Sequence, residues 1–82
     1  MDESRLETVF RQVLSLPGDA DARQVSVESW PAWDSMAQIN LILAVEQEFR
    51  VSFTPDEAAG LTSFVAYRDA VAAREDGGAE RG

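Results

Sequence analysis

Ser35 is the residue whose position offers the clearest chemistry in this chain. It follows Asp34 at the end of a loop-like segment, and residues 35–50 then read as an amphipathic helix without glycine or proline. The hydroxyl is therefore expected at a helix N-terminus, where backbone N–H groups lack partners and the helix dipole favours negative charge. Such a position suits a phosphate ester. We expect Ser35 to carry a phosphate-linked prosthetic group, with Asp34 as N-cap and as a carboxylate able to bind a metal–nucleotide complex during its attachment.

Ser35 is not expected to act as a catalytic nucleophile. The chain contains no histidine, lysine or cysteine. The base that activates the serine would have to be a carboxylate, and Asp34 is a poor proton acceptor for an alcohol. Paired carboxylates could in principle hydrolyse glycosides, but so short a chain offers no expected cleft or deep pocket for the substrate. We therefore predict that the protein is not an enzyme.

A metal site is not expected either. Asp19 and Asp21 are spaced like the first ligands of a calcium-binding loop. Arg23 falls where the next oxygen ligand is needed and Trp30 where the bidentate glutamate should be, so that interpretation fails. Without cysteine or histidine any metal site would need oxygen ligands alone, and no other spacing supports one.

Length and charge limit the remaining possibilities. The chain has 82 residues, which is one small domain, and 15 carboxylates against 7 arginines give a net charge of −8. Nucleic acid and anionic membranes are therefore poor partners, and proteins with basic patches are good ones. No apolar run resembles a signal peptide or a membrane span. We expect a cytoplasmic monomer.

A first helix is expected over residues 3–15. It carries an apolar stripe with helical spacing, and Pro17 and Gly18 are expected to stop it. Asp2, Glu3 or Ser4 can cap its start. The stripe, which predicts a core face, consists of Leu6, Val9, Phe10, Val13 and Leu14.

Residues 16–34 form a long connection between this helix and Ser35. A loop of this length in a small domain is usually functional or pinned by its own apolar residues. We expect both, because an anchored loop fixes where Ser35 points. The anchoring residues are expected to be Val25, Val27, Trp30 and Trp33.

The second helix, residues 35–50, has two apolar stripes rather than one. The core stripe is Leu41, Ile42, Val45 and Phe49. The second stripe adjoins Ser35 and consists of Met36, Ile39 and Leu43. It is either buried on the other side of the helix or is a docking face for a protein partner, and we favour docking. The polar residues expected beside this docking face are Asn40, Glu46 and Gln47.

Two further helices are expected after residue 53. Thr54 as N-cap, Pro55 at the first position and Glu57 at the third predict a capped helix, which Gly60 ends after barely two turns. Leu61 is expected to pack inward. The last helix is expected over residues 63–74, capped by Thr62 or Ser63. Its apolar stripe is Phe64, Tyr67 and Val71.

A family resemblance rests on the stretch Trp33-Asp34-Ser35-Met36 and the helix ending Val45-Glu46-Gln47-Glu48-Phe49. Together they resemble the second helix of acyl carrier proteins, in which Asp-Ser-Leu opens an aliphatic-rich helix that ends Leu-Glu-Glu-Glu-Phe. The likeness continues through Phe53, Pro55-Asp56-Glu57, Leu61-Thr62 and the last helix, so it covers about residues 5–73. The three-residue motif alone would be weak, but the motif, the helix ending and the spacing to Leu61-Thr62 are strong in combination.

The resemblance implies an all-α four-helix bundle of acyl-carrier type, with a long first loop and a short third helix. The carrier domain would span residues 1–74, followed by a disordered C-terminal tail over residues 75–82, which has no apolar residue larger than alanine. It also implies a 4′-phosphopantetheine group on Ser35, which holds acyl groups as thioesters and presents them to other enzymes. The carrier itself would catalyse nothing.

The implied partners are enzymes that modify, load or use the arm. A phosphopantetheinyl transferase would install the group from coenzyme A with magnesium. An acyltransferase or ligase would load it, and a ketosynthase or other tailoring enzymes would use the cargo. The expected docking residues toward them are Met36, Ile39, Asn40, Leu43, Glu46 and Gln47.

Departures from the family pattern bear on the pathway. Met36 replaces the usual leucine, a volume-conserving change, and Ala32 stands where glycine is common. The exposed helix face is less acidic than in many carriers, which weakens electrostatic steering and favours polyketide or other specialised biosynthesis over housekeeping fatty acid synthesis. Peptidyl carriers usually have Gly-Gly where this chain has Trp33-Asp34. The alternatives that remain open are an aminoacyl carrier and an unmodified interaction domain of carrier shape.

Overall fold

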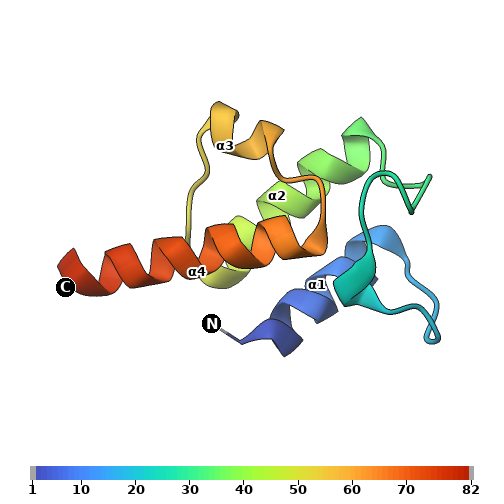
Figure 1. Cartoon of the computed structure of the whole chain (residues 1–82), viewed down its shortest axis with the longest axis horizontal. Coiled ribbons are helices and arrows are strands. Elements are labelled where there is room, and N and C mark those ends of the chain that lie inside the picture. Colours follow the sequence, from blue (N-terminus) through green and yellow to red (C-terminus); the bar gives the residue numbers. More distant parts are fainter. Residues whose placement is uncertain (1, 82) are drawn as a thin grey trace.

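The chain folds into four α-helices joined by loops, and a computed structural model describes residues 2–81, with side chains as far as Arg74 (Figure 1). The helices are α1 (Glu3–Leu14), α2 (Ser35–Phe49), α3 (Pro55–Ala59) and α4 (Phe64–Arg81), and a 3-10 turn, η1 (Ala22–Gln24), lies in the long loop. Over the described range there is no strand, only an isolated antiparallel bridge between Ser26 and Ser63. The all-α class is therefore confirmed.

α1 begins and ends through local backbone chemistry. The Asp2 carboxylate accepts a hydrogen bond from the Ser4 N–H and caps the start, as one of the predicted alternatives. The helix ends at Leu14. Its C-cap, two residues before Pro17, is Ser15, which adopts a left-handed conformation with φ 52° and donates its N–H to the Arg11 carbonyl. The predicted stop signal, Pro17 and Gly18, therefore lies beyond the C-cap. Ser15 itself ends the helix.

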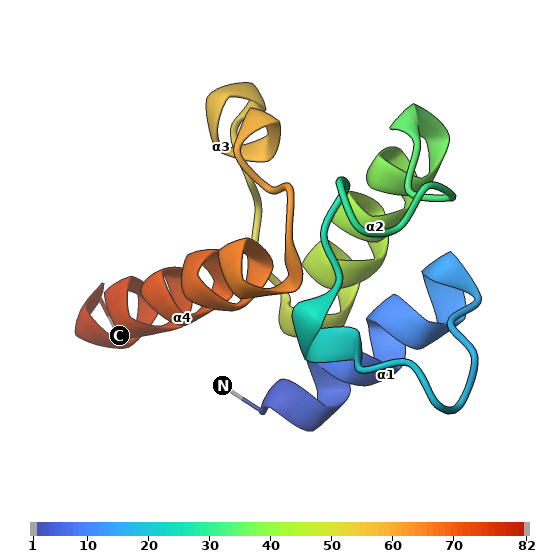
Figure 2. The same ribbon diagram turned by 45° about the vertical axis from the view of Figure 1, so that its right-hand side comes forward.

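The long loop returns along α1 before it reaches α2, as Figures 1 and 2 both show. It is joined to the start of α4 by two backbone bonds: the Val27 N–H donates to the Thr62 carbonyl and the Phe64 N–H donates to the Val25 carbonyl, both at 3.0 Å. Val25 is buried as predicted, but Val27 remains 38% exposed. These bonds join segments far apart in the sequence, so the pattern of residues alone does not predict them.

The core lies between α1, α2, α4 and the loop. Phe10 stands at its centre, with its ring edge-on to the rings of Trp33, Phe64 and Tyr67 at centroid distances of 5.6, 5.1 and 5.3 Å. Such edge-to-face pairs add to the stabilisation that burial alone provides. The predicted apolar stripes of all three long helices contribute to this core. Its fully buried members include Leu6, Phe10, Leu41, Val45, Phe64, Tyr67 and Val71.

α3 lies well away from α1 in both views (Figures 1 and 2). Its start is the predicted capping box, in which Thr54 Oγ1 accepts from the Glu57 N–H and the Glu57 carboxylate accepts from the Thr54 N–H. Arg74 of α4 forms an ion pair with Glu57. Glu57 thus both closes the cap of the short helix and joins that helix to α4.

α4 is longer than predicted. Its start is capped by Ser63, whose Oγ accepts from the Ala66 N–H at 3.1 Å. The helix was expected to end at Arg74, and residues 75–82 to be disordered, but α4 runs on to Arg81. Helical hydrogen bonds are local, so the helix continues past its buried stripe even through Gly77 and Gly78, although glycine disfavours helix. Gly82, the end of the expected tail, lies outside the described residues.

Candidate functional site

Ser35 is the first residue of α2, and its side chain is exposed. Asp34 is the N-cap: its Oδ1 accepts from the Ala37 N–H and its carbonyl accepts from the Gln38 N–H, both at 2.9 Å. The amides of Ser35 and Met36 come before the first intrahelical bond, so no carbonyl of the helix is available to them. The cap uses only one oxygen of the Asp34 carboxylate. The site combines an exposed hydroxyl with the N-terminal end of a helix, where the helix dipole favours negative charge.

Trp33 anchors the chain on the other side of Ser35. Its side chain is only 5% exposed, and its ring packs edge-on against Phe10. Its backbone N–H donates to the Trp30 carbonyl at 2.9 Å, which closes the tight turn before Asp34. Trp30 itself is half-buried against the core. The loop is therefore pinned two residues before the serine, as its aromatic residues predict.

The predicted docking stripe is exposed. Met36, Ile39 and Leu43 are 67%, 53% and 52% exposed, and they follow Ser35 along one side of α2. The opposite side carries the buried stripe Leu41, Val45 and Phe49, with Ile42 half-buried. α2 is therefore not buried on two sides, and the alternative in which both stripes belong to the core is wrong.

The three polar residues expected beside this stripe differ in their surroundings. Asn40 and Gln47 are exposed. Glu46 is half-buried, and its Oε2 accepts a hydrogen bond from the Phe53 N–H at 2.8 Å. That bond ties the end of α2 to the segment before α3, so the Glu46 carboxylate has a structural partner that its place on the helix does not reveal.

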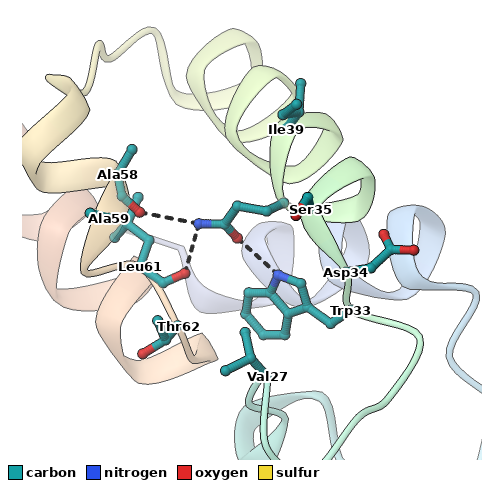
Figure 3. A pocket seen from close by; sticks show the side chains of 10 residues that line it. Val27, Trp33, Asp34, Ser35, Ile39, Ala58, Ala59, Leu61 and Thr62 are labelled. Carbon is teal, nitrogen blue, oxygen red and sulfur yellow. Dashed lines mark hydrogen bonds between the residues drawn. The ribbon is translucent and has the colours of Figure 1, made fainter.

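A pocket of about 570 Å³ opens beside Ser35 (Figure 3). Its walls come from the loop, the first two turns of α2, and α3 with the residues that follow it. They are lined by Val27, Trp33, Asp34, Ser35, Gln38, Ile39, Ala58, Ala59, Leu61 and Thr62. The pocket is an open groove and not a deep enclosed cavity, and one carboxylate, Asp34, lines it rather than a pair. Three separate segments form it, so no single stretch of sequence predicts it.

Gln38 is the residue of this site that sequence reasoning missed. Its amide nitrogen donates to the carbonyls of Ala58 and Leu61, at 3.2 and 2.9 Å, and its oxygen accepts from the Trp33 indole N–H at 2.8 Å. These three bonds are the dashed lines in Figure 3. The Tyr67 hydroxyl donates to the same oxygen at 3.2 Å. The only signal in the sequence is a glutamine one turn after Ser35, next to Ile39.

The electrostatics around Tyr67 keep that hydroxyl protonated. Burial raises the pKa of Tyr67 above its usual range, and the negative charge of Glu46 raises it further. The phenol therefore stays protonated, and able to donate to Gln38, beyond the pH at which a free tyrosine ionises.

Neither a metal-binding cluster nor a membrane-spanning helix is found in the part of the chain that is described. No group of three or more acidic, histidine or cysteine residues there could hold a metal ion. No helix among residues 2–81 is both long and apolar enough to cross a membrane.

Comparisons with known proteins assign no family to the chain. No protein-family model, curated protein or solved structure matches it significantly.

Proposed function

We propose that the chain is an acyl carrier protein in which Ser35 bears 4′-phosphopantetheine, and that it serves polyketide or other specialised biosynthesis. The observation that supports this most directly is the exposed Ser35 at the first position of α2, held between the Asp34 cap and the buried Trp33. A residue that another enzyme modifies must be accessible and rigidly positioned. Ser35 meets both requirements, and the fold has the short α3 that acyl carriers share.

The residues around Ser35 fit a phosphate-linked group. The phosphodiester would carry its negative charge next to the first amides of α2, where an anion is favoured. The Asp34 carboxylate is exposed at the same point and could bind the metal ion that accompanies the donor nucleotide during transfer. When bound, the group supplies a terminal thiol that carries acyl groups as thioesters, a function for which this cysteine-free chain has no side chain.

The apolar stripe supports the partners that we propose. Met36, Ile39 and Leu43 give the transferase, the acyl-loading acyltransferase or ligase, and a ketosynthase or tailoring enzyme a common surface beside Ser35. The chain has a net charge of −8, which favours partners with basic patches around an apolar centre. The same enzymes would therefore recognise the chain through apolar contact with the stripe together with attraction to its negative charge.

An unmodified interaction domain is the second candidate, because the same exposed stripe would bind a partner with or without an arm. An aminoacyl cargo is less favoured, since Trp33 and Asp34 stand where peptidyl carriers usually have two glycines, and both are needed here for the anchor and the cap. Retained binding of a partner by a Ser35→Ala protein that is never modified in its host would favour the interaction domain.

Co-expression with a phosphopantetheinyl transferase of broad specificity tests the proposal. We expect the intact mass of the protein to rise by one phosphopantetheine group, and we expect Ser35→Ala to abolish the increase. Ser52→Ala is the matched control, because Ser52 is also exposed but lies outside any helix, and it should be modified normally. An unchanged mass of the wild-type chain, under a transferase that modifies other carriers, would overturn the proposal.

A further inference from the structure

Gln38 spans the pocket beside Ser35 from one wall to the other. Its backbone belongs to α2, while its amide nitrogen donates to the carbonyls of Ala58 and Leu61 at 3.2 and 2.9 Å, at the end of α3 and just beyond it (Figure 3). The side chain thus joins the two elements whose separation sets the width of the groove.

The amide oxygen of the same side chain faces the core. It accepts from the Trp33 indole N–H at 2.8 Å and from the Tyr67 hydroxyl at 3.2 Å. A neutral glutamine amide has two donor hydrogens and one oxygen with two lone pairs, so these bonds use its full capacity. A fully satisfied polar group in a low-dielectric setting resists displacement, because every partner would lose its bond at once.

Gln38 also separates the groove from the aromatic core. Trp33, Gln38 and Leu61 line the pocket, whereas Tyr67, which bonds Gln38 from the other side, does not line it and is fully buried. Beyond Tyr67 the interior is filled by the Phe10 and Phe53 rings, at centroid distances of 5.3 and 6.3 Å. An apolar chain that moved inward would have to displace the amide and could not replace any of its hydrogen bonds.

We propose that Gln38 is a specificity-determining residue for the cargo, because it closes the inner end of the pocket. This inference rests on the proposed carrier function. Closure by Gln38 confines a linear acyl chain attached through Ser35 to the open groove between α2 and α3. A short acyl group is then shielded along the groove. A longer one continues past Ile39 toward solvent or a partner enzyme and does not enter the bundle.

A series of cargo lengths on the wild-type protein tests the confinement. Acetyl, butyryl and octanoyl forms are made with a broad-specificity transferase from the matching acyl-coenzyme A, and amide chemical shifts are compared by NMR. We expect the longer chains to shift the amides of Ile39, Ala59 and Thr62 and to leave those of Phe64 and Tyr67 unchanged. Shifts at Phe64 and Tyr67 in the octanoyl form would overturn the inference while the carrier function stood.

Two variants test whether Gln38 is the cause. Gln38→Met keeps the length of the side chain without its hydrogen bonds, and Gln38→Glu keeps the acceptors for Trp33 and Tyr67 but loses both donors. We expect the octanoyl chain to shift the Tyr67 amide in Gln38→Met. Gln12→Met, a change at an exposed glutamine of α1 that lies outside the predicted docking face, should behave as wild type. Unaltered octanoyl shifts in both Gln38 variants would show that another residue closes the pocket.

The unmodified protein provides an independent measurement. The Trp33 indole N–H should be protected from hydrogen exchange in wild type and in Gln38→Glu, and should lose that protection in Gln38→Met. An unprotected indole in wild type would overturn the closure whatever the cargo. If Ser35 takes no phosphopantetheine while the indole is protected, the carrier function and the role in cargo selection both fail, and only the structural contact remains.

Discussion

The two sides of α2 are almost equally apolar in sequence but opposite in their surroundings. The inner side, with Leu41 and Val45, is fully buried, whereas the outer side, with Ile39 and Leu43, is about half exposed. Burying the outer side as well would gain roughly 25 cal/mol for each Å² removed from water. The fold leaves this gain unused, and the partner-binding surface that we propose would account for it. Two apolar stripes on one helix can therefore have different surroundings, and hydrophobicity alone does not tell which of them packs into the core.

The largest effect should come from the inner side. Phe49 is 8% exposed at the end of α2, and the Arg5 guanidinium lies 5.0 Å from its ring centroid. Phe49→Ala removes a large buried aromatic side chain and should lower the free energy of unfolding by about 3–5 kcal/mol. Urea denaturation followed by circular dichroism measures the loss. A change below about 1 kcal/mol would mean that the inner side is less tightly packed than its burial indicates.

Much of this contrast could be predicted from local pattern. Helical spacing identified the core residues of α1 and α4, such as Phe10 and Tyr67, because a regular helix turns each periodic position to one side. The Asp34 cap and the Thr54 capping box were equally predictable, since each depends on residues at most three apart. The exposed position of Ser35 follows from the same local rules.

The rest depended on contacts between distant segments. The pocket needs α2, α3 and the loop together, and Gln38 acquires its role only when Ala58, Leu61 and Tyr67 are brought to it. The η1 turn was missed because three residues carry no periodicity. Glu46 was expected only beside the docking stripe, yet its bond to the Phe53 amide arises from how the chain turns after α2.

An intermediate effect should come from the polar contact between the pocket and the core. Tyr67→Phe removes the hydroxyl that donates to Gln38 and should lower the free energy of unfolding by about 1 kcal/mol at neutral pH. It should also remove a pH dependence. Tyr67 is the single tyrosine of a chain without lysine or cysteine, so few other groups titrate in the alkaline range.

The sign of that dependence follows from the raised pKa of Tyr67 in the folded state. Above about pH 10 the unfolded chain releases the phenolic proton while the folded chain keeps it, so the stability of the wild type falls as pH rises. Denaturation at neutral pH and at about pH 11 should show this fall in the wild type and a smaller one in Tyr67→Phe. Equal falls in both proteins would contradict the buried, protonated phenol.

The smallest effect on stability, and the sharpest test of the comparison, should come from the outer side. Leu43 is 52% exposed and does not line the pocket, so a change there leaves the groove beside Ser35 intact. Leu43→Glu should alter the free energy of unfolding by no more than about 0.5 kcal/mol. It should nevertheless slow modification of Ser35 by a transferase, because a charge would replace part of the apolar docking surface.

Val65→Glu is the matched control for Leu43→Glu. Val65 is 43% exposed on α4, so the two variants place the same charge at similarly exposed apolar positions on different helices. If Leu43→Glu unfolds the protein, the outer side of α2 belongs to the core after all. If both variants slow modification equally, net charge and not the position on α2 accounts for the effect. Slow modification of Leu43→Glu alone, with both variants fully folded, assigns the outer side of α2 to partner binding.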